Sequence, residues 1–238
     1  MRRALGDTVW PAVPSGALVL VPVGSTEQHG PHLPFDTDTT VALVVAQRTA
    51  DALPRGSCLV APALVYGASG EHADFPGTIS VGHEALREVI VELARSLSLW
   101  AGRVLFVNGH GGNAATLDTG LALLRAEGHE AAWTGCETPG GDAHAGRTET
   151  SLMLHLAPER VRLDAAVAGD TRPLAVLLPD LMAHGVRAVS PSGVLGDPAG
   201  ASAEEGRRTM DAMVSATVRR ITAWAVDGRG RLAEAERR

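Results

Sequence analysis

Residues 17–38 read ALVLVPVGSTEQHGPHLPFDTD, and the two halves of this stretch differ in character. The first half, residues 17–23, is apolar throughout and does not alternate with polar residues. A continuous apolar run of this length is typical of a strand in a parallel sheet, which other elements cover on both faces. The polar second half contains glycine and proline, and it predicts a loop at the carboxyl end of that strand.

The same order of strand, loop and helix recurs along the chain. Apolar runs at residues 59–61 and 104–107 predict two more buried strands. Helical patterns cover residues 41–53, 84–100, 114–127, 148–156 and 203–226. Asp38 or Thr39 is expected to cap the first of these helices. Ser202 is expected to cap the last, because Glu205 follows it at capping-box spacing.

This alternation predicts an α/β fold with three layers, α/β/α, around a mostly parallel sheet. No linker or repeat interrupts the pattern, so residues 1–238 are expected to form a single domain. The charged tail, residues 229–238, is expected to fray. In sheets of this class the functional site lies at the carboxyl ends of the strands.

Composition excludes several classes of function. The formal charge of −6 argues against a nucleic-acid partner, and all 21 basic residues are arginine, so lysine chemistry is absent. Two cysteines, Cys58 and Cys136, do not form a disulfide framework. The first residues contain no apolar run of signal-peptide length, and no apolar run is long enough to span a membrane, so neither a signal peptide nor a membrane segment is expected. The composition therefore predicts a soluble, cytoplasmic protein with no membrane partner.

The loop after the first strand is rich in metal-binding groups. Residues 27–38 contain two histidines and three carboxylates, and glycine and proline fix the turns between them. Imidazole and carboxylate are the groups that bind Zn, Mn or Fe. The alternative is a polar loop in which Asp38 only caps a helix.

Two further loops carry similar groups. Residues 108–113, NGHGGN, follow the strand at 104–107 and contain His110. A phosphate loop is the alternative there, but the loop has neither GxGxxG spacing nor a basic residue. The third segment, residues 142–151, contains His144 and then Glu149 in the first turn of a predicted helix. Together the three loops supply enough ligands for two ions that share a carboxylate, which can activate water and polarise a carbonyl.

These loops resemble the creatininase family. The matching segments are residues 23–34 with Asp36 and Asp38, residues 75–78, residues 108–113, and His144 with residues 149–151. The match covers about residues 15 to 156, and its first and third segments are highly specific. The resemblance implies a creatininase-like fold and a dinuclear, metal-dependent hydrolase of C–N bonds in amides.

The resemblance also implies a ligand set. Glu27, Asp38 and His110 would hold one ion, and His29 with the bridging Asp38 would hold the other. In creatininase the last ligand is a glutamate two residues after the loop histidine, where this chain has Gly112.

We therefore expect Glu149 to be the fifth ligand and part of the catalytic group. His144 matches the histidine that is proposed to shuttle protons in the family, which implies a general acid–base role.

Within the family, three segments resemble peptidases of the mycofactocin system, namely residues 66–72, 142–154 and 193–206. Those enzymes release a C-terminal Val-Tyr dipeptide from a modified precursor peptide during redox-cofactor biosynthesis. On this resemblance, Glu71 and His72 are expected to line the substrate entrance. Arg147 is expected to hold a terminal carboxylate through paired hydrogen bonds; the alternative is an ordinary surface arginine.

Two other functions compete with this one. A small-amide hydrolase of the creatinine or formamide type is the first, although Gly112 and an aromatic content of 3% disfavour a creatinine pocket. A non-enzymatic nucleotide- or metal-binding module is the second. Ligands without thiolate suit Zn, Mn and Fe alike, and the resemblance implies a homo-oligomer, commonly a hexamer.

Overall fold

In the computed structural model, which describes residues 3–234, four parallel strands form the centre of the fold. Their order in the sheet is β2-β1-β3-β4, and their bounds are Leu18–Val23 (β1), Cys58–Val60 (β2), Arg103–Asn108 (β3) and Ala131–Gly135 (β4). The three strands predicted from apolar runs are confirmed. The sequence reading missed β4, because this short segment begins with two alanines, which have weak strand propensity.

Six α-helices belong to the described part of the chain, beside several short 3-10 turns. Their bounds are Thr37–Ala52 (α1), Gly82–Leu97 (α2), Ala114–Ala126 (α3), Arg147–Leu156 (α4), Leu174–Val189 (α5) and Ala203–Ala223 (α6). The predicted cap of α6 is confirmed, since the Ser202 side chain accepts a hydrogen bond from the Glu205 N–H at 3.2 Å. Asp36 rather than Asp38 or Thr39 stands at the N-cap of α1, so that prediction was wrong.

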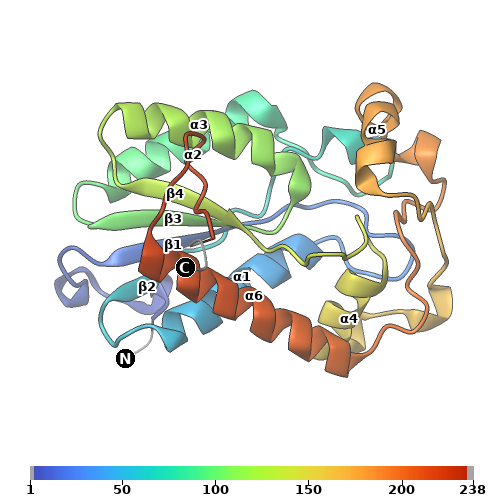
Figure 1. The fold of residues 1–238 in the computed structure, drawn as a ribbon, viewed down its shortest axis with the longest axis horizontal. Coiled ribbons are helices and arrows are strands. Elements are labelled where there is room, and N and C mark those ends of the chain that lie inside the picture. Colours follow the sequence, from blue (N-terminus) through green and yellow to red (C-terminus); the bar gives the residue numbers. More distant parts are fainter. Residues whose placement is uncertain (1–2, 235–238) are drawn as a thin grey trace.

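The helices complete the predicted three layers (Figure 1). Side chains of α2 and α3 pack on one face of the sheet, against Val19, Val21 and Phe106. Side chains of α1 and α6 pack on the other face, against Leu20 and Leu105. Successive strand residues thus enter opposite cores, which explains why the strand runs are apolar without alternation. Among the described residues, no helix has the length and apolarity needed to cross a bilayer.

Part of the tail pairs with β4 in the structure. The backbone N–H of Trp133 in β4 donates to Gly230 O, and the N–H of Leu232 donates to Trp133 O. The Leu232 side chain is buried. β4 is an edge strand with free backbone groups, and this segment satisfies some of them. The fraying of the tail stays a prediction, and residues 235–238 lie outside the described range.

Candidate metal centre

Three segments converge beyond the carboxyl ends of β1 and β3. The β1–α1 segment brings Glu27, His29 and Asp38, with Asp38 in the first turn of α1. His110 follows β3, and Glu149 lies in the first turn of α4. The structure therefore brings together all five residues that the sequence predicted as ligands.

Glu27, Asp38 and His110 form one cluster. Nδ1 of His110 lies 3.2 Å from Glu27 Oε1 and 3.2 Å from Asp38 Oδ2. All three residues are buried, and one ligand atom of each lies within 4.8 Å of the others. Nε2 of His110 lies 3.2 Å from the Ala68 carbonyl, which can only accept, so this nitrogen carries the proton. Nδ1 is left free toward the carboxylates, as a metal ligand requires.

His29 lies on the other side of Asp38. Its Nε2 is 3.0 Å from Asp38 Oδ1 and 3.9 Å from Glu149 Oε2. Its Nδ1 lies 3.1 Å from the carbonyl of Glu27, which places a ring proton on Nδ1 and makes Nε2 the nitrogen that a metal ion would take in place of a second proton. The two oxygens of Asp38 thus face different histidines, the arrangement needed of a carboxylate that bridges two cations.

The charges of the site call for a cation. Both carboxylate oxygens of Glu27 are buried and lack a hydrogen-bond partner in the structure, so only the nearby imidazoles balance this charge. A buried charge is costly unless it is both paired and hydrogen-bonded. Burial alone would raise the pKa of Glu27, but His110 and His72 hold it at about 2. Although burial acts against it, Asp38 raises the pKa of His29 to about 10. Divalent cations fit this donor set and would replace the protons that the imidazoles otherwise take up.

Glu149 completes the rim of the centre. The backbone N–H of Ala145 donates to its Oε2 at 2.6 Å. Ala145 has a φ of +52°, a conformation that is uncommon for a residue with a side chain. Burial raises the pKa of Glu149 to about 7, although His29 acts in the opposite direction. A nearby cation would favour its charged form.

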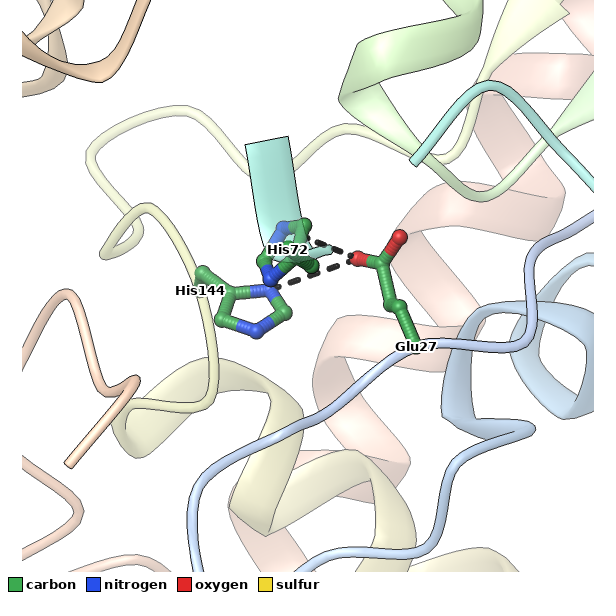
Figure 2. A group of neighbouring side chains, drawn as sticks. All are labelled: Glu27, His72 and His144. Carbon is green, nitrogen blue, oxygen red and sulfur yellow. Dashed lines mark ion pairs between the residues drawn. The ribbon is translucent and has the colours of Figure 1, made fainter. Parts of the chain in front are cut away.

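His144 and His72 face Glu27 together, as Figure 2 shows. Nδ1 of His144 lies 3.8 Å and Nε2 of His72 lies 3.3 Å from Glu27 Oε1. His144 is held by a short antiparallel contact, in which its backbone N–H donates to the Leu195 carbonyl and its own carbonyl accepts from the Leu195 N–H. Burial, together with the neighbouring His29 and His72, holds the pKa of His144 well below its ordinary value.

The three predicted substrate-binding residues lie in different surroundings. His72 is 4% exposed and lies inside the cluster rather than at an entrance. Glu71 is partly exposed, with Oε1 3.5 Å from Nε2 of His110. Arg147 is exposed and forms a two-point pair with Glu205, which it would have to release to hold a terminal carboxylate.

The sequence reading missed Gln28, which stands between two predicted ligands. Its buried side chain contacts both His72 and His144. Its position in the loop was the only signal, because a glutamine is a poor metal ligand and attracts no attention in a search for ligands.

Comparison with known proteins agrees with this geometry. The family model described as "Creatininase: Creatinine amidohydrolase" matches residues 7–221. A "Mycofactocin precursor peptide peptidase" of Mycobacterium tuberculosis (strain CDC 1551 / Oshkosh) is 53% identical over 228 residues, which are 92% of this chain and 91% of that protein. The protein of the same name from Mycolicibacterium smegmatis is 52% identical over 218 residues, 90% of this chain and 88% of that one. A "Creatinine amidohydrolase" of Pseudomonas putida is 32% identical over 196 residues, 70% and 71% of the two chains.

Solved structures agree as well. The structure named "Creatininase Mn" superposes with a TM-score of 0.77 at 26% identity and covers 94% of this chain and 99% of its own. A creatininase variant of "Zn-Zn type" gives 0.77 at 25% identity, with 94% and 98% covered. These names record manganese and zinc in the relatives. From its family model, its relatives and its fold, this chain belongs to the creatininase family.

Proposed function

We propose that this protein is a metal-dependent peptidase that cleaves the mycofactocin precursor peptide and releases its C-terminal Val-Tyr dipeptide. The identity of 52–53% over about nine-tenths of the chain to mycofactocin precursor peptide peptidases supports the substrate. The observation that carries the chemistry is Asp38, which presents one oxygen to His110 and the other to His29 inside a buried, carboxylate-rich cluster.

We infer that Glu27, Asp38 and His110 hold one ion and that His29, Asp38 and Glu149 hold a second. When bound, two divalent cations activate water and polarise the carbonyl of the scissile amide. Zinc, manganese and iron all suit these ligands.

His144 is suited to move the proton. Its Nε2 lies 2.8 Å from the backbone carbonyl of Gln28, which can only accept, so Nε2 carries the ring proton. Nδ1 is therefore free and directed toward Glu27 and the centre. From there it can take a proton from the attacking water and give it to the leaving amine.

Two variants separate the assigned roles. Glu149→Gln is expected to lose bound metal, because an amide is a weaker ligand than a carboxylate. His144→Ala is expected to keep the metal and to lose turnover of the modified precursor peptide. Mass spectrometry of the peptide fragments measures this turnover. Glu84→Gln is a matched control for the first, since Glu84 is also a first-turn glutamate but is exposed. Normal turnover by His144→Ala would remove His144 from the mechanism.

The substrate assignment has its own test. Purified protein is incubated separately with the modified precursor peptide and with creatinine, the substrate named for the Pseudomonas putida relative. Release of the dipeptide is expected with the first and no reaction with the second. Efficient creatinine hydrolysis without peptide cleavage would contradict the proposal. The oligomeric state, which we expect to be a hexamer, is measured on the same sample by light scattering.

A further inference from the structure

Gln28 lies at the centre of a hydrogen-bonded group that joins four parts of the chain. Its side chain is 5% exposed. The backbone N–H of Gly30 donates to its Oε1 at 2.8 Å. Its Nε2 lies 2.8 Å from Nδ1 of His72 and 3.1 Å from Nε2 of His144, and it donates to the carbonyl of Gly193 at 3.1 Å.

These contacts determine which way the amide points. A backbone N–H can only donate, so the atom that faces Gly30 is the oxygen. The Gly193 carbonyl can only accept, which independently places the nitrogen on the opposite side. Nε2 of His144 carries its own proton, which it donates to the backbone carbonyl of Gln28, so it does not accept from the amide. The two hydrogens of the amide nitrogen therefore serve Gly193 and Nδ1 of His72.

The orientation of the amide fixes the tautomer of His72. Since Nδ1 accepts a hydrogen bond from Gln28, the ring proton of neutral His72 is on Nε2, the nitrogen 3.3 Å from Glu27 Oε1. This pattern is the reverse of that in His29 and His110, which keep their protons on the nitrogen turned away from the cluster. When cations replace the second protons of His29 and His110, these two predicted ligands present a lone pair to the centre, whereas His72 presents an N–H.

His72 and His144 consequently offer opposite groups to the same carboxylate (Figure 2). His144 also carries its proton on Nε2, but it turns its Nδ1 toward Glu27. A nitrogen that bears a proton cannot bind a metal ion. Although Glu27, His72 and His144 have the spacing of a metal-binding triad, His72 lacks a free nitrogen on that side.

We propose that Gln28 is a positioning residue whose side-chain amide makes His72 a hydrogen-bond donor to the centre instead of a metal ligand. The inference rests on the proposed function, and it excludes His72 from the residues that bind the metal ions. The N–H of His72 is then available to a carboxylate of the centre or to an oxygen of the scissile amide.

The segment around Gly193 supports this role of Gln28. Gly193 has a φ of +81°, and a β carbon there would stand 1.9 Å from Oε1 of Gln28. Two residues further on, Leu195 holds the backbone of His144. Residues 193–195 thus contact both Gln28 and the backbone of His144, and they help to hold both residues in place beside the centre.

The first experiment reads the tautomers directly. Zinc-loaded protein labelled with nitrogen-15 in histidine is studied by NMR correlations between ring nitrogens and carbon-bound ring protons. We expect the His72 proton on Nε2 in the wild type. In Gln28→Glu it is expected on Nδ1, because a carboxylate there can only accept. The His72 signals are assigned by their loss in His72→Gln. A wild-type proton on Nδ1 would overturn the proposal.

The second experiment measures metal content and turnover. Gln28→Met keeps the length of the side chain but removes both polar atoms. It is expected to bind as much metal as the wild type and to lose kcat by roughly 10- to 100-fold, with a smaller change in KM. His72→Gln, whose amide N–H can stand in for Nε2–H, is expected to retain metal and part of kcat. Loss of metal from His72→Gln would show that His72 is a ligand, and unchanged kcat in Gln28→Met would also refute the role.

A third variant keeps Gln28 and moves it. Gly193→Ala is expected to displace the amide and lower kcat as Gln28→Met does. Gly56→Ala is the matched control, because Gly56 has the same φ of +81° with nothing within 4 Å; it carries the backbone strain alone and is expected to leave kcat unchanged. Equal kcat in the two glycine variants would contradict the proposal. If the wild type did not cleave the precursor peptide, the proposed function would fail, while tautomers and metal content would still decide the role of Gln28.

Discussion

Glu71 fills the space beside His110 into which a side chain at position 112 would point: a β carbon on Gly112 would stand 2.5 Å from Oε1 of Glu71. It would also stand 2.4 Å from Nε2 of His110 and 2.7 Å from the Ala68 carbonyl. The φ of Gly112 is not positive, so its backbone does not require glycine. The space does. Glu71 thus occupies, from another segment, the volume that any side chain at 112 would need.

We predict that Gly112→Ala weakens metal binding by roughly 10- to 100-fold, because the added methyl group displaces the ring of a predicted ligand from its carbonyl partner. Metal content after dialysis against graded chelator measures this change. Gly111→Ala is the control, since nothing lies within 4 Å of its added carbon. Metal affinity equal to the wild type in Gly112→Ala would mean that His110 is not a ligand.

The sequence alone predicts which residues gather in the candidate site, but it does not predict the contacts that their side chains make. Glu27, His29 and Asp38 lie in one loop, and the rule that sites form at carboxyl ends of parallel strands added His110. The burial of His72 inside the cluster could not be read from sequence, because it depends on where a long loop after β2 folds back. The pair between Arg147 and Glu205 likewise depends on how α4 packs on α6.

We predict that Glu27→Gln removes most of the thermal stabilisation that added metal gives. Both oxygens of Glu27 are buried without a hydrogen-bond partner, so a bound cation is their natural counter-charge. For the wild type, free metal at a hundred times its Kd stabilises by about 2.7 kcal/mol. Unfolding scans with and without zinc measure the difference. Glu159→Gln, at an exposed position, should keep the full shift, and an undiminished shift in Glu27→Gln would contradict its role as a ligand.

We predict that the cysteines react slowly in the native protein. Burial raises the pKa of Cys58 from 9.0 to about 12 despite the nearby Arg3, and desolvation likewise raises the pKa of Cys136, which is only partly buried, to about 12. At pH 8 the reactive thiolate is therefore roughly a thousandfold scarcer than in an exposed cysteine. Labelling with a chromogenic disulfide should proceed only after denaturation, and peptidase activity should survive the reagent but not a chelator. Rapid native labelling with loss of activity would favour a thiol enzyme.

The fold was predictable where local pattern and packing agree. Apolar runs identified β1 and β3, and the Ser202 cap fixed the start of α6. Helix α5 was missed because it contains Pro179 and Gly185, both of which normally interrupt helices. The pairing of residues 230 and 232 with β4 could not be predicted from the sequence, because the backbone partners that β4 offers exist only once the sheet is assembled.

We predict that Leu232→Ala destabilises the protein by about 2 to 5 kcal/mol, the usual cost of a cavity at a buried leucine. Leu232 is 2% exposed, packs with the core between the sheet and α6, and lies next to the backbone bonds that join the tail to Trp133. Leu99→Ala is the control, because Leu99 is 87% exposed and its truncation should change the free energy of unfolding by less than about 0.5 kcal/mol. Denaturant unfolding of the metal-loaded proteins measures both. The metal centre lies beyond the carboxyl ends of the strands, so Leu232→Ala should keep its metal content. Equal stability of the two variants would mean that the tail frays in solution.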